Sequence, residues 1–217
     1  MQYTTILFDL DGTLTDPGIG ITNSFMYALE KYNIKVKDRS ELYPLIGPPL
    51  PVSFSEHFGF DEQTCKEAIA YYREYYREKG LFENEVYEGI EGVLQHLKDA
   101  GCQLAVATSK PEHFAKQILE YFHLAEYFTV IAGSNMDESR AEKAEVIQYC
   151  LEQLGVNDKS QVLMIGDRKY DVIGGHACDL KVMGVLFGYG EEKEFIEAGA
   201  DYIVPTVDAI AEFVLAK

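Results

Sequence analysis

Strand-like and helix-like segments alternate along most of the chain, and this alternation restricts the possible folds more than any other feature. Between the strand-like runs, apolar residues recur at helical spacing. Strict alternation of strand and helix is typical of βαβ units, in which helices cover both faces of a parallel sheet. The sequence therefore predicts an α/β fold with a doubly wound parallel sheet. Its six expected strands are apolar or β-branched runs at Thr5–Leu10, Gln103–Thr108, Phe128–Ala132, Gln161–Ile165, Val182–Phe187 and Tyr202–Val204.

One connection is much longer than the others. About 90 residues separate the first predicted strand from the second, whereas a plain crossover needs only a dozen or two. The extra residues, 17–81, show helical periodicity in Ile21–Tyr32 and Asp61–Lys79 and contain no good strand. The sequence therefore predicts a small helical domain inserted after the first strand, within an α/β core made of residues 1–16 and 82–217.

The charge of the chain limits its partners. Its 217 residues include 19 Lys and Arg against 36 Asp and Glu, a formal net charge of −17. Such a charge repels nucleic-acid and anionic-lipid surfaces, so we expect neither nucleic acid nor a membrane as partner. The absence of a charged-then-apolar leader and of an apolar run of about 18 residues predicts a cytoplasmic protein. Four widely spaced cysteines without a C-x-x-C pair indicate reduced, buried thiols.

Polar side chains follow three of the predicted strands where each strand ends. The stretch FDLDGTLTD places Asp9 and Asp11 on the same side of the first strand end. The second strand runs into Thr108–Lys110, and the fourth runs into Gly166–Asp171. Ligands bind outside the carboxyl ends of the strands in open parallel sheets. Because crowded carboxylates recruit a cation, the sequence predicts a divalent-metal site of hard oxygen ligands.

Together these motifs resemble those of the haloacid dehalogenase superfamily. D-x-D-G-T after the first strand, a hydroxyl residue after the second, a lysine at a helix start and G-D-x-x-x-D after a later strand match its four motifs in order. The insertion resembles the small helical cap of its phosphatases, a group that includes phosphoglycolate phosphatases, 5′-nucleotidase-like enzymes and β-phosphoglucomutase. The resemblance implies a Rossmann-like core and a Mg²⁺-dependent phosphatase. Its expected substrates are small phosphate monoesters of the phosphoglycolate or 5′-nucleotide type, hydrolysed through an aspartyl-phosphate.

The resemblance also implies roles for the acidic residues. Asp9 corresponds to the nucleophile that attacks phosphorus. Asp11 corresponds to the general acid that protonates the leaving oxygen and then to the base that activates water. Asp9, Asp167 and the backbone carbonyl of Asp11 correspond to the Mg²⁺ ligands. Asp171 is expected among these ligands or just behind them.

Further residues are assigned to the substrate phosphate. Thr108 resembles the motif-two hydroxyl that donates to a phosphate oxygen, and Ser109 is expected to add a donor. Lys143 fits the motif-three lysine best, because it opens a helix before an apolar stripe. Arg140 is the second candidate, since this chain lacks the prolines that flank that lysine in the commoner form of the motif.

Several of these residues also fit purely structural roles. Thr108 and Ser109 are also placed to cap the helix that begins near Pro111. Lys110 is expected to be a solvated loop residue or the partner of a carboxylate. Asp171 is explained equally well as a helix N-cap.

Two other functions stay open. A phosphomutase similar to β-phosphoglucomutase needs a cationic anchor in the insert for the second phosphate of its bisphosphate intermediate. The stretch Pro44–Phe54 contains no Lys or Arg, which favours a hydrolase, while Arg73 and Arg77 keep the mutase possible. A receiver-like phospho-acceptor also gathers acidic residues at strand ends, but it needs no insert. The sequence leaves the particular monoester and the oligomeric state open.

Overall fold

The structure is a computed structural model, and it describes residues 2–136 and 139–216. Backbone contacts divide the chain into two compact units. One consists of Met1–Thr15 and Val86–Lys217, and the other of Asp16–Glu85. The role of the second unit as a cap stays a prediction, and each unit is described by itself.

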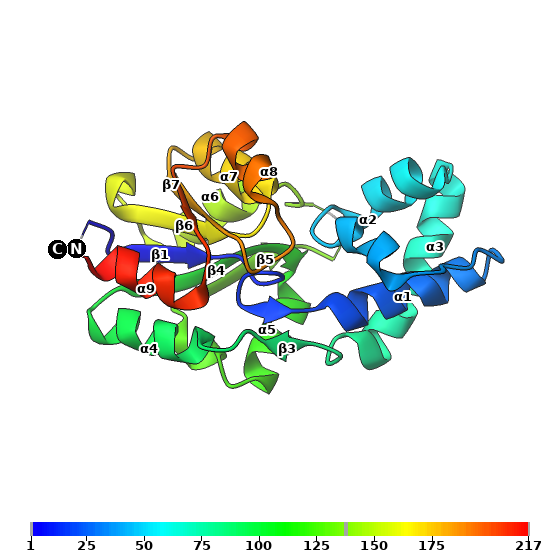
Figure 1. The fold of residues 1–217 in the computed structure, drawn as a ribbon, viewed down its shortest axis with the longest axis horizontal. Coiled ribbons are helices and arrows are strands. Elements are labelled where there is room, and N and C mark those ends of the chain that lie inside the picture. The colour runs from blue at the N-terminus through cyan, green and yellow to red at the C-terminus, as the bar shows by residue number, and fades with distance from the viewer. Residues whose placement is uncertain (1, 137–138, 217) are drawn as a thin grey trace. The chain divides into compact units, whose positions relative to one another are not determined.

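The larger unit is built on a six-stranded, entirely parallel sheet (Figure 1). The strand order is β5-β4-β1-β6-β7-β8, so the first strand lies between two strands from much later in the chain. The carboxyl ends of β4, β1 and β6 therefore lie side by side, at the place where ligands bind in such sheets. The strands are β1 Thr5–Phe8, β4 Gln103–Pro111, β5 Val130–Ser134, β6 Val162–Gly166, β7 Lys181–Val185 and β8 Tyr202–Val204.

All six predicted strands are present, and their ends differ from the prediction by up to three residues. The largest difference is at β4, which continues to Pro111 after a shift in its pairing with β5 that follows Ala107. The first strand ends at Phe8 rather than Leu10, because the chain turns out of the sheet at the following residues. The apolar pattern thus predicted where the strands lie, but it did not predict the residue at which each strand ends.

Helices cover both faces of this sheet (Figure 1). The helices α6 and α7 pack on one face, and α4, α5 and α9 pack on the other. On the first face, Leu7 and Met164 from the sheet pack with Val146 and Ile147 from α6, all fully buried. The α-helices are α4 Ile90–Asp99, α5 Glu112–Tyr121, α6 Lys143–Leu154, α7 Lys169–Ala177, α8 Glu192–Ala198 and α9 Val207–Leu215, with short 3₁₀ helices η4 Ala125–Tyr127 and η5 Lys159–Gln161.

The second unit is helical, and aromatic side chains form much of its core. The ring centroid of Phe25 lies 5.2 Å from that of Phe54 and 5.0 Å from that of Tyr72. Asp61 caps the long helix by accepting a hydrogen bond of 2.8 Å from the backbone N–H of Thr64. The elements are α1 Gly18–Glu30, α2 Leu50–Val52 and α3 Glu62–Tyr75, a 3₁₀ helix η1 Arg39–Leu45, and π-helical turns η2 Ser53–His57 and η3 Tyr76–Gly80. The short strands β2 Thr15–Asp16 and β3 Glu85–Val86 pair where the chain passes between the units.

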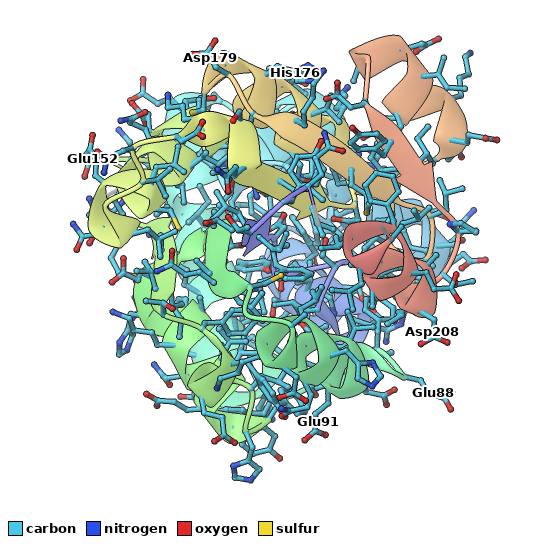
Figure 2. All side chains as sticks on the ribbon, turned by 90° about the vertical axis from the view of Figure 1, so that its left-hand side faces the viewer. Glu88, Glu91, Glu152, His176, Asp179 and Asp208 are labelled. Atoms are coloured by element: carbon cyan, nitrogen blue, oxygen red, sulfur yellow. The ribbon has the colours of Figure 1, made fainter. Side chains whose placement is uncertain are left out.

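Acidic side chains project from the surface of the larger unit. Figure 2 shows acidic side chains pointing away from the ribbon on α4, α6 and α9, just before α4 and just after α7; these are Glu88, Glu91, Glu152, Asp179 and Asp208. They account for part of the net charge of −17. Among the described residues, no helix has the length and apolar character needed to cross a bilayer, which takes about 20 residues.

Candidate active site

The turn after β1 positions the two aspartates of the first motif. The backbone N–H of Asp9 donates to the carbonyl of Ile165 at 2.8 Å, which extends the pairing of β1 with β6 by one residue. Gly12 then adopts a φ of +78°, and a Cβ on it would lie 2.0 Å from Oδ2 of Asp167. Only glycine tolerates both the conformation and the close approach. The turn therefore brings Asp9 and Asp11 to the end of β6, where Asp167 lies.

Three carboxylates meet at this edge of the sheet. Asp9, Asp167 and Asp171 each offer one oxygen, and these oxygens lie within 4.8 Å of one another. Burial raises the pKa of Asp167 well above its ordinary value, and the negative charges of Asp171 and Asp9 raise it further. Burial also raises the pKa of Asp171 to about 6, against the opposing effect of a nearby lysine. The cluster thus concentrates negative charge that a cation would stabilise.

Lys143 lies between two of these carboxylates. Its Nζ is 2.9 Å from Oδ2 of Asp9 and 2.7 Å from Oδ1 of Asp171, and it donates to the carbonyl of Ala107 at 3.1 Å. Burial alone would lower the pKa of this ammonium group, but the charges of Asp171 and Asp9 outweigh burial and raise the pKa above its ordinary value. Lys143 is the first residue of α6, as the motif pattern predicts.

Arg140, the second candidate for this cation, is engaged elsewhere. Its Nε donates to the carbonyl of Gly133 at 2.8 Å, and its Nη2 lies 3.2 Å from Oε2 of Glu112. Its guanidinium also lies over the ring of Tyr149, 3.7 Å from the centroid. Arg140 therefore anchors the chain before α6, and of the two candidates it is Lys143 that reaches the carboxylates.

The side chain of Asp171 lies at the third position of α7, and Arg168 rather than Asp171 is the N-cap residue. The role of Asp171 at a metal stays a prediction. Its Oδ2 accepts a hydrogen bond of 3.0 Å from the backbone N–H of Arg168, in the first turn of α7. Its Oδ1 contacts Lys143 and faces the carboxylate cluster. One carboxylate thus stabilises the start of α7 and pairs with the ammonium group of Lys143.

Thr108 lies near the end of β4 with only 2% of its surface exposed. Its Oγ1 accepts a hydrogen bond of 3.2 Å from the backbone N–H of Lys110, which leaves the hydroxyl proton for another acceptor. The N-cap residue of the helix α5 is Pro111, which makes no side-chain capping hydrogen bond. The alternative that Thr108 and Ser109 cap this helix is therefore wrong.

Lys110 pairs with the second aspartate of the first motif. Its Nζ lies 2.5 Å from Oδ2 of Asp11, and the side chains are 6% and 16% exposed. Burial raises the pKa of the Asp11 carboxyl, and the charge of Lys110 opposes this effect. The expectation of a solvated loop residue is thus wrong for Lys110, and the expectation of a carboxylate partner is confirmed.

A loop after β7 also contacts Asp167, and the sequence did not lead us to expect it. The backbone N–H of Tyr189 donates to Oδ2 of Asp167 at 2.8 Å. A Cβ on Gly188 would lie 2.4 Å from Cβ of Asp167, and one on Gly190 would lie 2.0 Å from its carbonyl oxygen. The signal available in the sequence was the run G-Y-G just after a predicted strand, because the carboxyl ends of parallel strands meet at one edge.

The geometry of the carboxylates fits a divalent cation. Oδ1 of Asp167 is buried and has no hydrogen-bond partner among residues 2–136 and 139–216. An unsatisfied buried acceptor calls for a partner such as an ion, and carboxylate oxygens are the ligands that Mg²⁺ prefers. Oδ2 of Asp11 pairs with Lys110, and its Oδ1 is, like that of Asp167, a buried acceptor without a hydrogen-bond partner in the described part of the chain. The backbone carbonyl of Asp11, which the resemblance implies as a metal ligand, stays a prediction.

Carboxylates, a lysine and a hydroxyl residue at the carboxyl edge of a parallel sheet define an enzyme suited to phosphoryl transfer. Such reactions depend on positioning and on neutralising the charge of the phosphoryl oxygens. Asp9, Lys143 and Thr108 are residues of the types that this chemistry needs, and the fold brings them from three separate segments to one edge.

Comparisons with known proteins identify the family. The model of the haloacid dehalogenase-like hydrolases matches residues 6–185. A 5′-nucleotidase of Pseudomonas aeruginosa is 43% identical over 194 residues, which are 89% of this chain and 87% of that protein. The tyrosine-protein kinase PtkA of Mycobacterium tuberculosis is 37% identical over 210 residues, 95% of this chain and 71% of that protein. A crystal structure described as a "predicted phosphatase" from Clostridium acetobutylicum is 50% identical and superposes with a TM-score of 0.95 over 99% of both chains.

The chain therefore belongs to the haloacid dehalogenase-like hydrolase family, and it is a phosphatase of that family. The family assignment agrees with the resemblance drawn from the four motifs, and the six-stranded parallel sheet confirms the expected Rossmann-like core.

Proposed function

We propose that the protein is a Mg²⁺-dependent phosphatase that hydrolyses small phosphate monoesters through an aspartyl-phosphate on Asp9. The observation that carries the proposal is the placement of the Asp9 carboxylate, 2.9 Å from the ammonium of Lys143 and within 4.8 Å of Asp167 and Asp171. A carboxylate held beside an ammonium group, next to other candidate metal ligands, is suited to nucleophilic attack on phosphorus. The names of the nucleotidase and phosphatase relatives support the same reaction class.

In the first step, an oxygen of Asp9 forms a bond to phosphorus while the bond from phosphorus to the ester oxygen breaks. Asp11 gives a proton to the departing oxygen, so the alcohol leaves neutral. Thr108, Ser109 and Lys143 would donate to the phosphoryl oxygens and orient the phosphoryl group. A Mg²⁺ ion held by Asp9, Asp167 and the carbonyl of Asp11 would supply further charge neutralisation.

In the second step, water attacks phosphorus and Asp11 takes a proton from it. The bond from phosphorus to Asp9 breaks, inorganic phosphate leaves and both aspartates return to their starting state. The overall reaction converts one ester and one water into one alcohol and one phosphate. Splitting hydrolysis in this way replaces one difficult displacement by two easier ones.

The test is phosphate release by the purified protein with a panel of phosphomonoesters, with Mg²⁺ and with excess EDTA. We expect Asp9→Asn to abolish release and Asp11→Asn to reduce it about 10²–10⁴-fold, the usual contribution of general acid–base catalysis. Asp179→Asn, whose side chain is 89% exposed, serves as the control and keeps full activity. Release that persists in EDTA, or in Asp9→Asn, would refute the mechanism.

The same panel identifies the substrate class. It contains 2-phosphoglycolate and 5′-nucleotides, the two substrate types that the family resemblance implies. It also contains β-glucose 1-phosphate with a trace of the 1,6-bisphosphate, which tests the mutase alternative. ATP with a tyrosine peptide is included because one relative is named a tyrosine-protein kinase. We expect inorganic phosphate as the product. Glucose 6-phosphate formed without phosphate release would instead establish the mutase.

A further inference from the structure

Lys110 presents a buried ammonium group that the proposed reaction does not use. Its side chain is 6% exposed and lies 2.5 Å from Oδ2 of Asp11, whose side chain is 16% exposed. A charge placed so far from water is costly unless a partner compensates it. Each of these two side chains therefore restricts the other to an orientation in which they meet.

The backbone beneath Lys110 is held in place as well. The pairing of β4 with β5 shifts register between Ala107 and Pro111, and such irregularities re-aim side chains. The N–H of Lys110 donates to Oγ1 of Thr108, and its carbonyl oxygen lies where a Cβ on Gly133 would approach to 2.5 Å. The long lysine side chain thus starts from a fixed point and ends at Asp11.

Each of the two aspartates of the first motif pairs with a different lysine. Nζ of Lys143 contacts Asp9, and Nζ of Lys110 contacts Asp11. Asp9 and Asp11 lie two positions apart in one turn and have the same side chain, so their different partners give them different surroundings. Lys110 thereby directs the carboxylate of Asp11 separately from that of Asp9.

We propose that Lys110 is a positioning residue, which holds the Asp11 carboxylate where a proton can pass between it and the leaving oxygen of the substrate. The inference rests on the proposed function, in which Asp11 carries that proton. A displacement of about 1 Å at a reacting group can cost about 10²-fold in rate, so the loss of Lys110 has a measurable effect even though it takes no part in bond making.

The experiment compares two aryl phosphates of similar size, phenyl phosphate and 4-nitrophenyl phosphate, with Mg²⁺ present. Phenolate is the poorer leaving group, so its departure depends more strongly on a proton from Asp11. We expect Lys110→Met to lower kcat/KM for phenyl phosphate about 10²-fold and to lower it much less for 4-nitrophenyl phosphate. Lys110→Arg keeps a cation in reach of the carboxylate and restores most of the loss.

Controls separate this effect from a folding defect. Lys116→Met, a change at a half-exposed lysine on α5, retains both activities. Lys110→Gln repeats the measurement with a polar side chain if the methionine variant does not fold. An equal loss on both aryl phosphates, or no rescue by Lys110→Arg, would overturn the proposal.

A double-mutant cycle distinguishes failure of this inference from failure of the proposed function. In the Asp11→Asn background, Lys110→Met should produce no further change in leaving-group preference, because the two residues act through one proton transfer. If Asp11→Asn itself retains wild-type rates, the proposed function is wrong. If Asp11→Asn shows the preference and Lys110→Met does not, only the inference is wrong.

A third substrate tests a competing role, in which Lys110 binds a second anionic group of the substrate. Phenyl phosphate has no such group, whereas 2-phosphoglycolate has a carboxylate. The positioning role predicts that Lys110→Met lowers kcat/KM for both. A raised KM confined to 2-phosphoglycolate, with phenyl phosphate unaffected, would contradict it.

Discussion

Lys143 begins α6 with its side chain 5% exposed and in contact with the carboxylates of Asp9 and Asp171. An ammonium group in this position separates charges that would otherwise repel each other at short range. Breaking a buried ion pair by removing one partner typically costs about 3–5 kcal/mol, because the remaining charge has no compensation. At the scale of single residues, this lysine therefore contributes to stability as well as to the site.

We expect Lys143→Met to lower the free energy of unfolding in EDTA by about 3 kcal/mol or more. Added Mg²⁺ should stabilise this variant more than it stabilises the wild type, because the ion then neutralises carboxylates that have lost their lysine. Urea unfolding with EDTA and with Mg²⁺ measures both effects. Lys159→Met, at a more exposed lysine, is the control and should unfold like the wild type. Equal stability of Lys143→Met and wild type in EDTA would show that the buried contacts have no net effect.

At the scale of secondary-structure elements, Asp201 connects α7 and β7 to the segment before β8. Its Oδ1 accepts from Nζ of Lys181 at 2.6 Å, and its Oδ2 accepts from the backbone N–H of Val182 at 2.9 Å. Nε2 of His176 lies 3.0 Å from the same Oδ2. Burial alone would raise the pKa of Asp201, but these hydrogen bonds and the charge of Lys181 lower it below its ordinary value.

This lowered pKa predicts how the junction responds to acid. The ionised Asp201 carboxylate stabilises the folded state fully at pH values above its unfolded-state pKa of about 3.9. This stabilisation is lost as the pH falls through the lower pKa that Asp201 has in the folded state. We expect Asp201→Asn to be about 1–2 kcal/mol less stable than the wild type at pH 7, and this difference should shrink between pH 5 and pH 3. Urea unfolding of the variant and the wild type from pH 7 to pH 3 measures this difference in the free energy of unfolding. Glu120→Gln, at an exposed position, controls for the loss of one negative charge. A difference that stays constant with pH would contradict the role given to the carboxylate.

At the scale of the whole molecule, the four cysteines are buried thiols that form no disulfide, three in the larger unit and one in the smaller; they are Cys65, Cys102, Cys150 and Cys178. Burial raises the pKa of all four thiols, that of Cys150 to about 12. Only the thiolate reacts with thiol reagents, so burial suppresses both access and ionisation.

Thiol titration with Ellman's reagent at pH 8 should therefore detect almost no reactive thiol in the native protein. In denaturant, all four should react at once. Because the two units bury their cysteines separately, a thiol that reacts early would identify the unit that opens first. Four rapid reactions in the native protein would contradict the burial of the cysteines.

Local patterns in the sequence located much of this molecule. Apolar runs placed all six strands of the sheet, and the motif residues Asp9, Asp167 and Lys143 do meet at its carboxyl edge. Local sequence patterns did not predict features that depend on contacts between segments far apart in the chain. The loop at Gly188 and Gly190 was missed because its effect is on Asp167, about 20 residues earlier in the chain.

Hydrophobic periodicity and turn residues act over a few positions, so the sequence alone predicted the succession of strands and the types of residue at their ends. The pairing of the charged side chains, in contrast, follows from the three-dimensional structure. Lys110, Arg140 and Lys143 are equally basic in the sequence, yet one pairs with Asp11, one anchors a loop and one joins the carboxylate cluster. The physical reason is that a charge–charge contact acts over a few ångströms, and those distances depend on the register shift in β4 and on where α6 begins.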